Sequence, residues 1–309
     1  MRAAQSSNEG TSTPEGAAPR ADAPPIEVLR GDFRRGDFRA ALLDFDGTLS
    51  LIRRGWPEVM IPMMVDVLAQ TGTAEPPDAL SAHVEEFVMR LNGKQTIYQM
   101  MQLADEVRAR GGQPLDPLEY KHRYHELLWQ RVEQRIAGLA SGTHSQDELT
   151  VPASHRLLER LRAAGLTLYL ASGTDLAYVQ NELRVLGLDR YFGPHVYGAL
   201  DDYRQFSKKM IIERIIDEAG VEGHQLVGFG DGYVEIEEVR AAGGVAIGVA
   251  SNEETREGVN QWKRERLIRA GADLIIGDYR CQDALFELLG LEPAADKPPA
   301  AGDARRPAS

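Results

Sequence analysis

The chain has 309 residues, of which 43% are hydrophobic and 27% are charged, with a net charge of −12 at pH 7. This size and composition are typical of a globular protein with one core, or with one core and a smaller second unit. The acidic balance argues against a general nucleic-acid binder, and the single cysteine, Cys281, excludes an internal disulfide or a multi-cysteine zinc site.

The two ends of the chain, residues 1–25 and 292–309, are rich in Ala, Pro, Ser and Gly. They contain too few large apolar side chains to offset the entropy of ordering, so we predict a disordered tail at each end. No apolar run approaches the ~20 residues that a membrane span needs, and the N-terminus lacks the apolar stretch of a secretory signal. We therefore expect no membrane partner and a cytoplasmic protein.

The first predicted strand, residues 40–45, leads into two aspartates, Asp44 and Asp46. No convincing strand follows until residue 166. Instead, helical apolar spacing appears at 57–70, 78–91, 95–110 and 117–139. We therefore predict an all-helical unit, residues 53–149, inserted directly after the first strand.

Beyond the insert, strand patterns alternate with helical patterns. The strand patterns lie at 166–172, 194–200, 224–231, 243–251 and 272–278. The helical patterns between and after them lie at 175–186, 208–219, 233–242, 254–270 and 281–290. This alternation predicts an α/β fold with a Rossmann-like three-layer core and a parallel sheet, built from residues 26–52 and 150–291.

Polar residues follow several of the predicted strands, where ligands bind in open parallel sheets. They come from four separate segments: Asp44 and Asp46; Ser172, Gly173 and Thr174; Lys208 and Lys209; and Asp231 and Glu235. Mg²⁺ prefers oxygen ligands, and Asp44 and Asp231 can supply two of them. The set suits phosphoryl transfer.

Each group has a part in that chemistry. A carboxylate beside a metal and a lysine stays ionised and can attack phosphorus. A second carboxylate two positions later can protonate the leaving oxygen and then deprotonate a water. A serine hydroxyl and backbone N–H groups can hold the phosphoryl oxygens, and the lysine neutralises charge as it develops.

The motifs that carry these residues resemble, in order and spacing, the four motifs of the haloacid dehalogenase superfamily of phosphohydrolases. They read DFDGT (44–48), ASGT (171–174), SKK (207–209) and GFGDGYVEIEE (228–238). The resemblance implies that Asp44 is the nucleophile and a Mg²⁺ ligand, and that Asp46 is the general acid and base, with its backbone carbonyl on the metal. It further implies that Ser172, with Gly173 and Thr174, binds the phosphoryl group, and that Asp231 is a metal ligand.

Two positions depart from the family pattern. Glu235 stands where a second aspartate is usual, so we place it beside the metal, in contact directly or through a water. Lys208 fits the third motif better than Lys209 because it begins a helix, and Lys209 is the reserve candidate. The presence of Asp46 favours a phosphatase or a phosphomutase, because family members that act on carbon–halogen bonds generally lack this aspartate.

The helical insert resembles the cap of this superfamily, which covers the site and implies a small phosphorylated metabolite as substrate. Its candidate substrate contacts are Arg53 and Arg54, in the segment that leads into the cap, and Lys94, at the start of a helix. The alternative for Lys94 is a solvated loop. We interpret the basic stretch 262–269 as a solvated helix face.

We therefore predict a Mg²⁺-dependent phosphatase that hydrolyses a small phosphate monoester through an aspartyl-phosphate, similar to phosphoglycolate or sugar-phosphate phosphatases. Two alternatives stay open: a phosphomutase of the sugar-phosphate type, and a non-catalytic binding module that kept the fold.

Overall fold

The computed structural model describes residues 26–291, so the predicted tails lie outside the described residues. Seven strands form one sheet in the order β1-β7-β6-β5-β2-β3-β4. Their bounds are β1 Glu27–Val28, β2 Ala40–Leu43, β3 Thr167–Asp175, β4 Val196–Ala199, β5 Leu226–Gly230, β6 Val245–Val249 and β7 Leu274–Ile276. Every pair is parallel except β1 with β7. The parallel α/β core predicted from the alternating pattern is confirmed.

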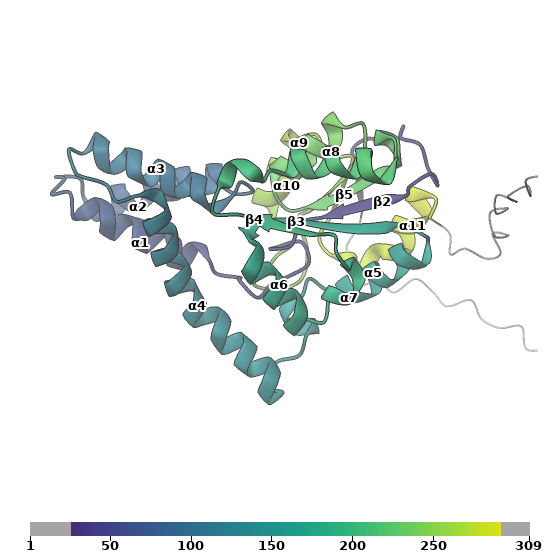
Figure 1. Cartoon of the computed structure of the whole chain (residues 1–309), viewed down its shortest axis with the longest axis horizontal. Helices are drawn as coiled ribbons and strands as arrows, with labels where there is room; N and C mark the ends of the chain where they lie inside the picture. Colours follow the sequence, from purple (N-terminus) through teal and green to yellow (C-terminus); the bar gives the residue numbers. More distant parts are fainter. Residues whose placement is uncertain (1–25, 292–309) are drawn as a thin grey trace, which may run out of the picture.

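Helices cover both faces of this sheet, which makes three layers (Figure 1). Alternate residues of β2 face opposite layers, as the twofold period of a strand requires. Ala40 and Leu42 pack with α8, α9 and α10, whereas Ala41 and Leu43 pack with α5, α6, α7 and α11. The bounds are α5 Ser154–Ala163, α6 Leu176–Val185, α7 Asp189–Phe192, α8 Lys208–Ala219, α9 Tyr233–Ala241, α10 Gln261–Arg269 and α11 Gln282–Leu289.

Four helices lie between β2 and β3 in the chain and extend away from the sheet, forming the cap (Figure 1). They are α1 Pro57–Ala69, α2 Pro77–Leu91, α3 Thr96–Ala109 and α4 Pro117–Ser141. Three of them begin with proline, which lacks the N–H that has no acceptor at a helix start. Gly142 follows the last residue of α4, and its φ of 77° is the left-handed conformation typical of a helix end. The prediction of an all-helical insert is confirmed, while its limits at 53 and 149 stay a prediction.

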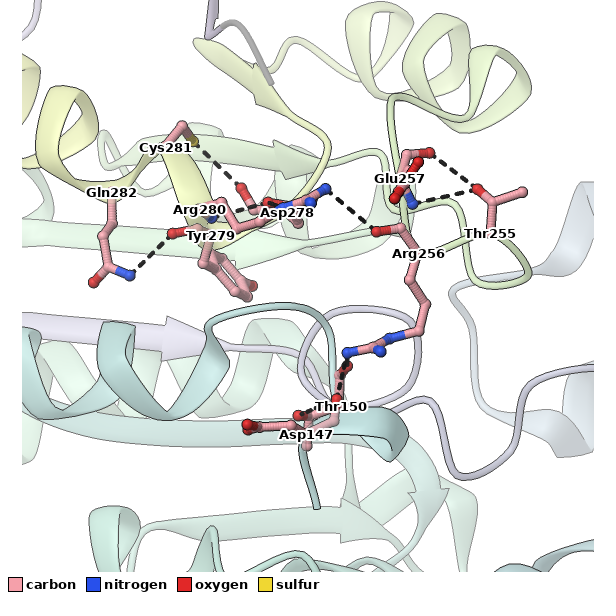
Figure 2. Close-up of polar contacts among 10 residues, drawn as sticks. All are labelled: Asp147, Thr150, Thr255, Arg256, Glu257, Asp278, Tyr279, Arg280, Cys281 and Gln282. Atoms are coloured by element: carbon pink, nitrogen blue, oxygen red, sulfur yellow. Dashed lines mark hydrogen bonds and ion pairs between the residues drawn. The ribbon is translucent and has the colours of Figure 1, made fainter. Parts of the chain in front are cut away.

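The helix predicted over 254–270 begins only at Gln261, where the Asn260 side chain accepts a hydrogen bond from the N–H of Lys263. Residues 254–260 form a loop instead, and Arg256 in this loop contacts a distant segment of the chain (Figure 2). The guanidinium of Arg256 reaches the carbonyl oxygens of Asp147 and Thr150, where the chain returns from the cap to the core. The loop therefore ties two distant segments together, which helical spacing alone could not indicate.

Several short elements complete the described chain. Single 3₁₀ turns occur at Asp147–Leu149, Tyr203–Gln205, Gly223–Gln225 and Tyr279–Cys281. The edge strand β1 and helix α7 were not predicted, because two and four residues are too few to show a period. No helix within residues 26–291 has the length and apolar character needed to cross a bilayer.

Candidate active site

The predicted polar groups meet at the carboxyl ends of three neighbouring strands. β2 lies between β3 and β5, so Asp44, which follows β2, is close to both Ser172 of β3 and Asp231, which follows β5. Asp44 is held in register because its N–H donates to the carbonyl of Phe229 at 3.0 Å. The sheet topology alone therefore brings together motifs that are far apart in sequence.

A buried lysine joins two of the acidic groups. The Nζ of Lys208 lies 2.9 Å from Oδ1 of Asp44 and 2.7 Å from Oε2 of Glu235. Burial alone would lower the pKa of Lys208, but the two carboxylates outweigh it and raise the pKa, so the ammonium stays charged. Its backbone position follows from Ser207, whose side chain caps α8 by accepting a hydrogen bond from the N–H of Met210.

The structure decides between the two candidate lysines of the third motif. Lys209 points away from the pocket, with 64% of its side chain exposed and a 3.9 Å ion pair to Glu213 on the same helix. Lys208 is therefore the lysine beside Asp44, and Lys209, the reserve candidate, lies on the exposed side of α8. Two successive helical residues face directions about 100° apart, so only one of them can reach Asp44.

Three carboxyl groups form a cluster that suits a divalent cation. Oxygens of Asp44, Asp231 and Glu235 lie within 4.8 Å of one another. Burial raises the pKa of Asp44 well above its ordinary value, and the nearby charges of Glu235 and Asp231 add to this, while Lys208 opposes it. A buried carboxylate crowded by others is stabilised by a cation, and a set made only of oxygen ligands fits Mg²⁺.

Asp46 lies in a different environment, just past the strand end. Its Oδ2 accepts hydrogen bonds from the hydroxyls of Thr174 at 2.8 Å and Ser172 at 3.4 Å. Burial, together with the negative charge of Glu182, raises the pKa of Asp46 to about 6, although Arg53, 3.8 Å away, opposes the shift. A carboxyl group with this pKa can both give and take a proton near neutral pH.

Two glycines are required for close approaches around these side chains. A Cβ on Gly47, whose φ is 71°, would lie 2.2 Å from Oδ2 of Asp231. A Cβ on Gly173 would lie 3.0 Å from the carbonyl oxygen of Lys94 in the cap. The first glycine allows the turn after Asp46 to pass beside Asp231, and the second lets the cap come down onto the core.

Core and cap together line one pocket, with an empty volume of about 740 Å³ that includes the open solvent at its mouth. The core contributes the groups described above. The cap side contributes Arg54, Trp56, Asn92, Lys94, Gln99 and Tyr124. Substrate would therefore lie between the strand ends and the cap, as the position of the insert predicts.

Arg53 also lines this pocket, but its guanidinium has a partner within the protein. It forms a two-pronged ion pair with Glu182 of α6, with nitrogen–oxygen distances of 2.7–3.1 Å. This pairing holds Arg53 beside Asp46, and the direct substrate contact predicted for Arg53 stays a prediction. Arg54 and Lys94 also line the pocket, and they stay candidate substrate contacts.

Sequence reasoning missed one buried lysine of the site, Lys263. Its Nζ lies 2.8 Å from Oδ2 of Asp231, 2.7 Å from Oε1 of Glu253 and 3.1 Å from the hydroxyl of Ser251. Burial would lower the pKa of Lys263, but Asp231 and Glu253 raise it. Because Lys263 holds one carboxylate oxygen of Asp231, the other remains available to a metal.

The interpretation of 262–269 as a solvated face is wrong for this residue. Lys263 and Leu267 are both buried, one helical turn apart. The spacing of Lys263 from the apolar Leu267 was the signal that could have placed it on the covered face.

Comparisons with known proteins agree with this arrangement. The family model of haloacid dehalogenase-like hydrolases matches residues 38–243. A haloacid dehalogenase-like protein of unknown function from Agrobacterium tumefaciens has a similar fold, with 21% identity, a TM-score of 0.53, and coverage of 82% of this chain and 99% of its own. A predicted phosphoglycolate phosphatase from Haemophilus somnus is 16% identical, with a TM-score of 0.53 and coverage of 81% and 98%.

A hydrolase from Pseudomonas syringae shares the fold at 17% identity and a TM-score of 0.53, with 81% of this chain and 98% of that one covered. No curated protein is similar enough to count as a match. At identities this low, the structural similarity shows a shared fold only. The family model spans more than half of the chain and includes all four motifs. The chain therefore belongs to the haloacid dehalogenase-like hydrolases.

Proposed function

We propose that this enzyme is a Mg²⁺-dependent phosphatase that hydrolyses a small phosphate monoester through an aspartyl-phosphate on Asp44. The observation that carries the proposal is the pairing of two aspartates with different environments. Asp44 lies against the ammonium of Lys208, whereas Asp46 accepts hydrogen bonds from two hydroxyl groups, has Arg53 3.8 Å away and has its pKa raised by burial to about 6. One is suited to act as a nucleophile and the other as an acid.

In the first step, a carboxylate oxygen of Asp44 forms a bond to phosphorus while the bond from phosphorus to the ester oxygen breaks. Asp46 gives its proton to that leaving oxygen, so the alcohol departs neutral. Ser172 lines the pocket and would hold a phosphoryl oxygen, and Lys208 would neutralise charge at the reacting group.

In the second step, Asp46 takes a proton from a water, whose oxygen attacks phosphorus and releases phosphate and the Asp44 carboxylate. Asp44, Asp231 and the backbone carbonyl of Asp46 would hold Mg²⁺, with Glu235 beside them. The bound cation would neutralise the phosphoryl oxygens and let the anionic nucleophile approach them.

The test is phosphate release from a panel of small phosphate monoesters, with Mg²⁺ or with EDTA. We expect turnover with Mg²⁺ only, and its loss in Asp44→Asn. Phosphate release by Asp44→Asn at the wild-type rate would remove the proposed nucleophile. An inert wild-type protein across the panel would instead favour the non-catalytic alternative.

A phosphomutase remains the second candidate, because the cap loop at Lys94 lies directly on Gly173 and would shield a phospho-aspartate from water. The two functions differ in product. A mutase yields an isomerised phosphate ester and a persistent phospho-enzyme, whereas a phosphatase yields free phosphate.

A further inference from the structure

Two cations on the cap side of the pocket have no acidic partner among residues 26–291. They are Arg54, in the segment after β2, and Lys94, in the loop between α2 and α3. Within residues 26–291 neither forms an ion pair, and the Lys94 ammonium has only the ring of Tyr98, 5.7 Å away. The other cations that line the pocket, Lys208 and Arg53, are already paired with carboxylates. Arg54 and Lys94 are therefore the ones available to an anionic ligand.

The loop that carries Lys94 is held in place from the core. The buried side chain of Gln95 donates to two carbonyl groups of the segment before α8, at 3.1 Å to Tyr203 and 2.8 Å to Phe206. From α10, the guanidinium of Arg266 donates to three carbonyl groups at the end of α2, those of Met89, Arg90 and Asn92. The backbone of Lys94 is thus fixed on both sides.

The segment that carries Arg54 is also anchored. Arg135 of α4 donates to the carbonyl oxygens of Ile52 at 2.6 Å and of Arg54 itself at 2.9 Å. Both cations therefore line the pocket from backbone that other elements hold in place. Because the backbone is already held, only the two side chains lose freedom when an anion binds.

We propose that Arg54 and Lys94 form a second anion site, which binds a carboxylate or a further phosphate at the non-reacting end of the substrate. The inference rests on the proposed function for the reacting end. It narrows the substrate class to small phosphate monoesters that carry another negative charge, in preference to phosphates of neutral alcohols or sugars. The site would take its ligand by charge-assisted hydrogen bonds from both side chains.

Phosphonates test this site separately from catalysis, because their carbon–phosphorus bond is not hydrolysed by ester chemistry. We would measure by calorimetry, with Mg²⁺ present, the binding of 3-phosphonopropionate, its neutral amide and propane-1,3-bisphosphonate. The acid or the bisphosphonate should bind at least about tenfold more tightly than the amide. The acid and the bisphosphonate together tell which anion the site prefers.

The variants are Arg54→Met, Lys94→Met and the double variant, with Arg123→Met as control. Arg123 is an exposed cation of α4 that does not line the pocket. The ratio of the affinity for the acid or the bisphosphonate to the affinity for the amide should fall about threefold or more in each single variant. This ratio should reach one in the double variant and stay at the wild-type value in the control. Equal binding of all three phosphonates by the wild type, or an advantage that survives in the double variant, would overturn the site.

Esters then separate this inference from the proposed function. Turnover of esters without preference for a second charge would leave the phosphatase and remove the site. A phosphonate preference without any ester turnover would keep the site and remove the phosphatase.

Discussion

The buried ion pair between Arg53 and Glu182 gives a quantitative test of how the cap segment is attached to the core. The two side chains are 9% and 0% exposed, and three nitrogen–oxygen contacts of 2.7–3.1 Å join them. Arg53→Met keeps much of the aliphatic volume but leaves the Glu182 carboxylate buried without a partner. Removing one partner of such a pair costs about 3–5 kcal/mol of unfolding free energy.

Urea unfolding at pH 7, followed by circular dichroism, measures this loss. In Arg53→Met/Glu182→Leu the buried Glu182 carboxylate is removed together with its partner, so most of the stability should return, less what Arg53 contributes to Asp46, 3.8 Å away. The control is Arg108→Met, because Arg108 pairs with Asp105 on the surface, with both side chains more than half exposed. Its loss should stay under about 1 kcal/mol. The reasoning fails if Arg53→Met loses no more than this control, or if the double variant is no more stable than the single.

Three further predictions concern the site. Asp46 must be protonated in the first step, and its pKa is about 6. We therefore expect kcat/KM for alkyl phosphates to fall about tenfold for each pH unit above pH 6. The pH profile of Asp46→Asn should not show this fall. Because burial and neighbouring carboxylates raise the pKa of Asp44, its ionised form destabilises the metal-free protein. Asp44→Asn should therefore raise the metal-free Tm at pH 7 and reduce the stabilisation by Mg²⁺, where an unchanged Tm would contradict the crowding argument. Gly173→Ala should push the Lys94 carbonyl away and lower kcat/KM by about tenfold with an unaltered unfolding curve, whereas wild-type kinetics would show that the contact is dispensable.

The strand ends were predictable from sequence because two independent signals coincide there. Apolar runs such as residues 40–43 mark buried strands, and polar residues directly after them mark the edge where parallel strands end. Asp44, Ser172 and Asp231 could be placed together on this basis, because the topology of a parallel sheet leaves few other arrangements.

The remaining contacts depend on tertiary geometry that no local pattern records. Lys263 reaches Asp231 because α10 lies over β6 and β7, and the basic composition of that helix suggested solvent instead. Arg256 interrupts a predicted helix because its guanidinium binds carbonyl groups more than 100 residues earlier in the chain. Arg53 is matched by Glu182 across an interface that forms only when the cap segment and α6 pack together.

Helix α10 has two attachments on neighbouring turns. Lys263 forms an ion pair with Asp231. Arg266, three residues later, donates hydrogen bonds to backbone carbonyls at the end of cap helix α2. Because a helix is stiff over one turn, Lys263 and Arg266 move together, and a displacement of one contact also displaces the other. If the cap moves outward to admit a substrate, α10 offers a route by which that motion reaches Asp231, the proposed metal ligand, without any contact to the substrate.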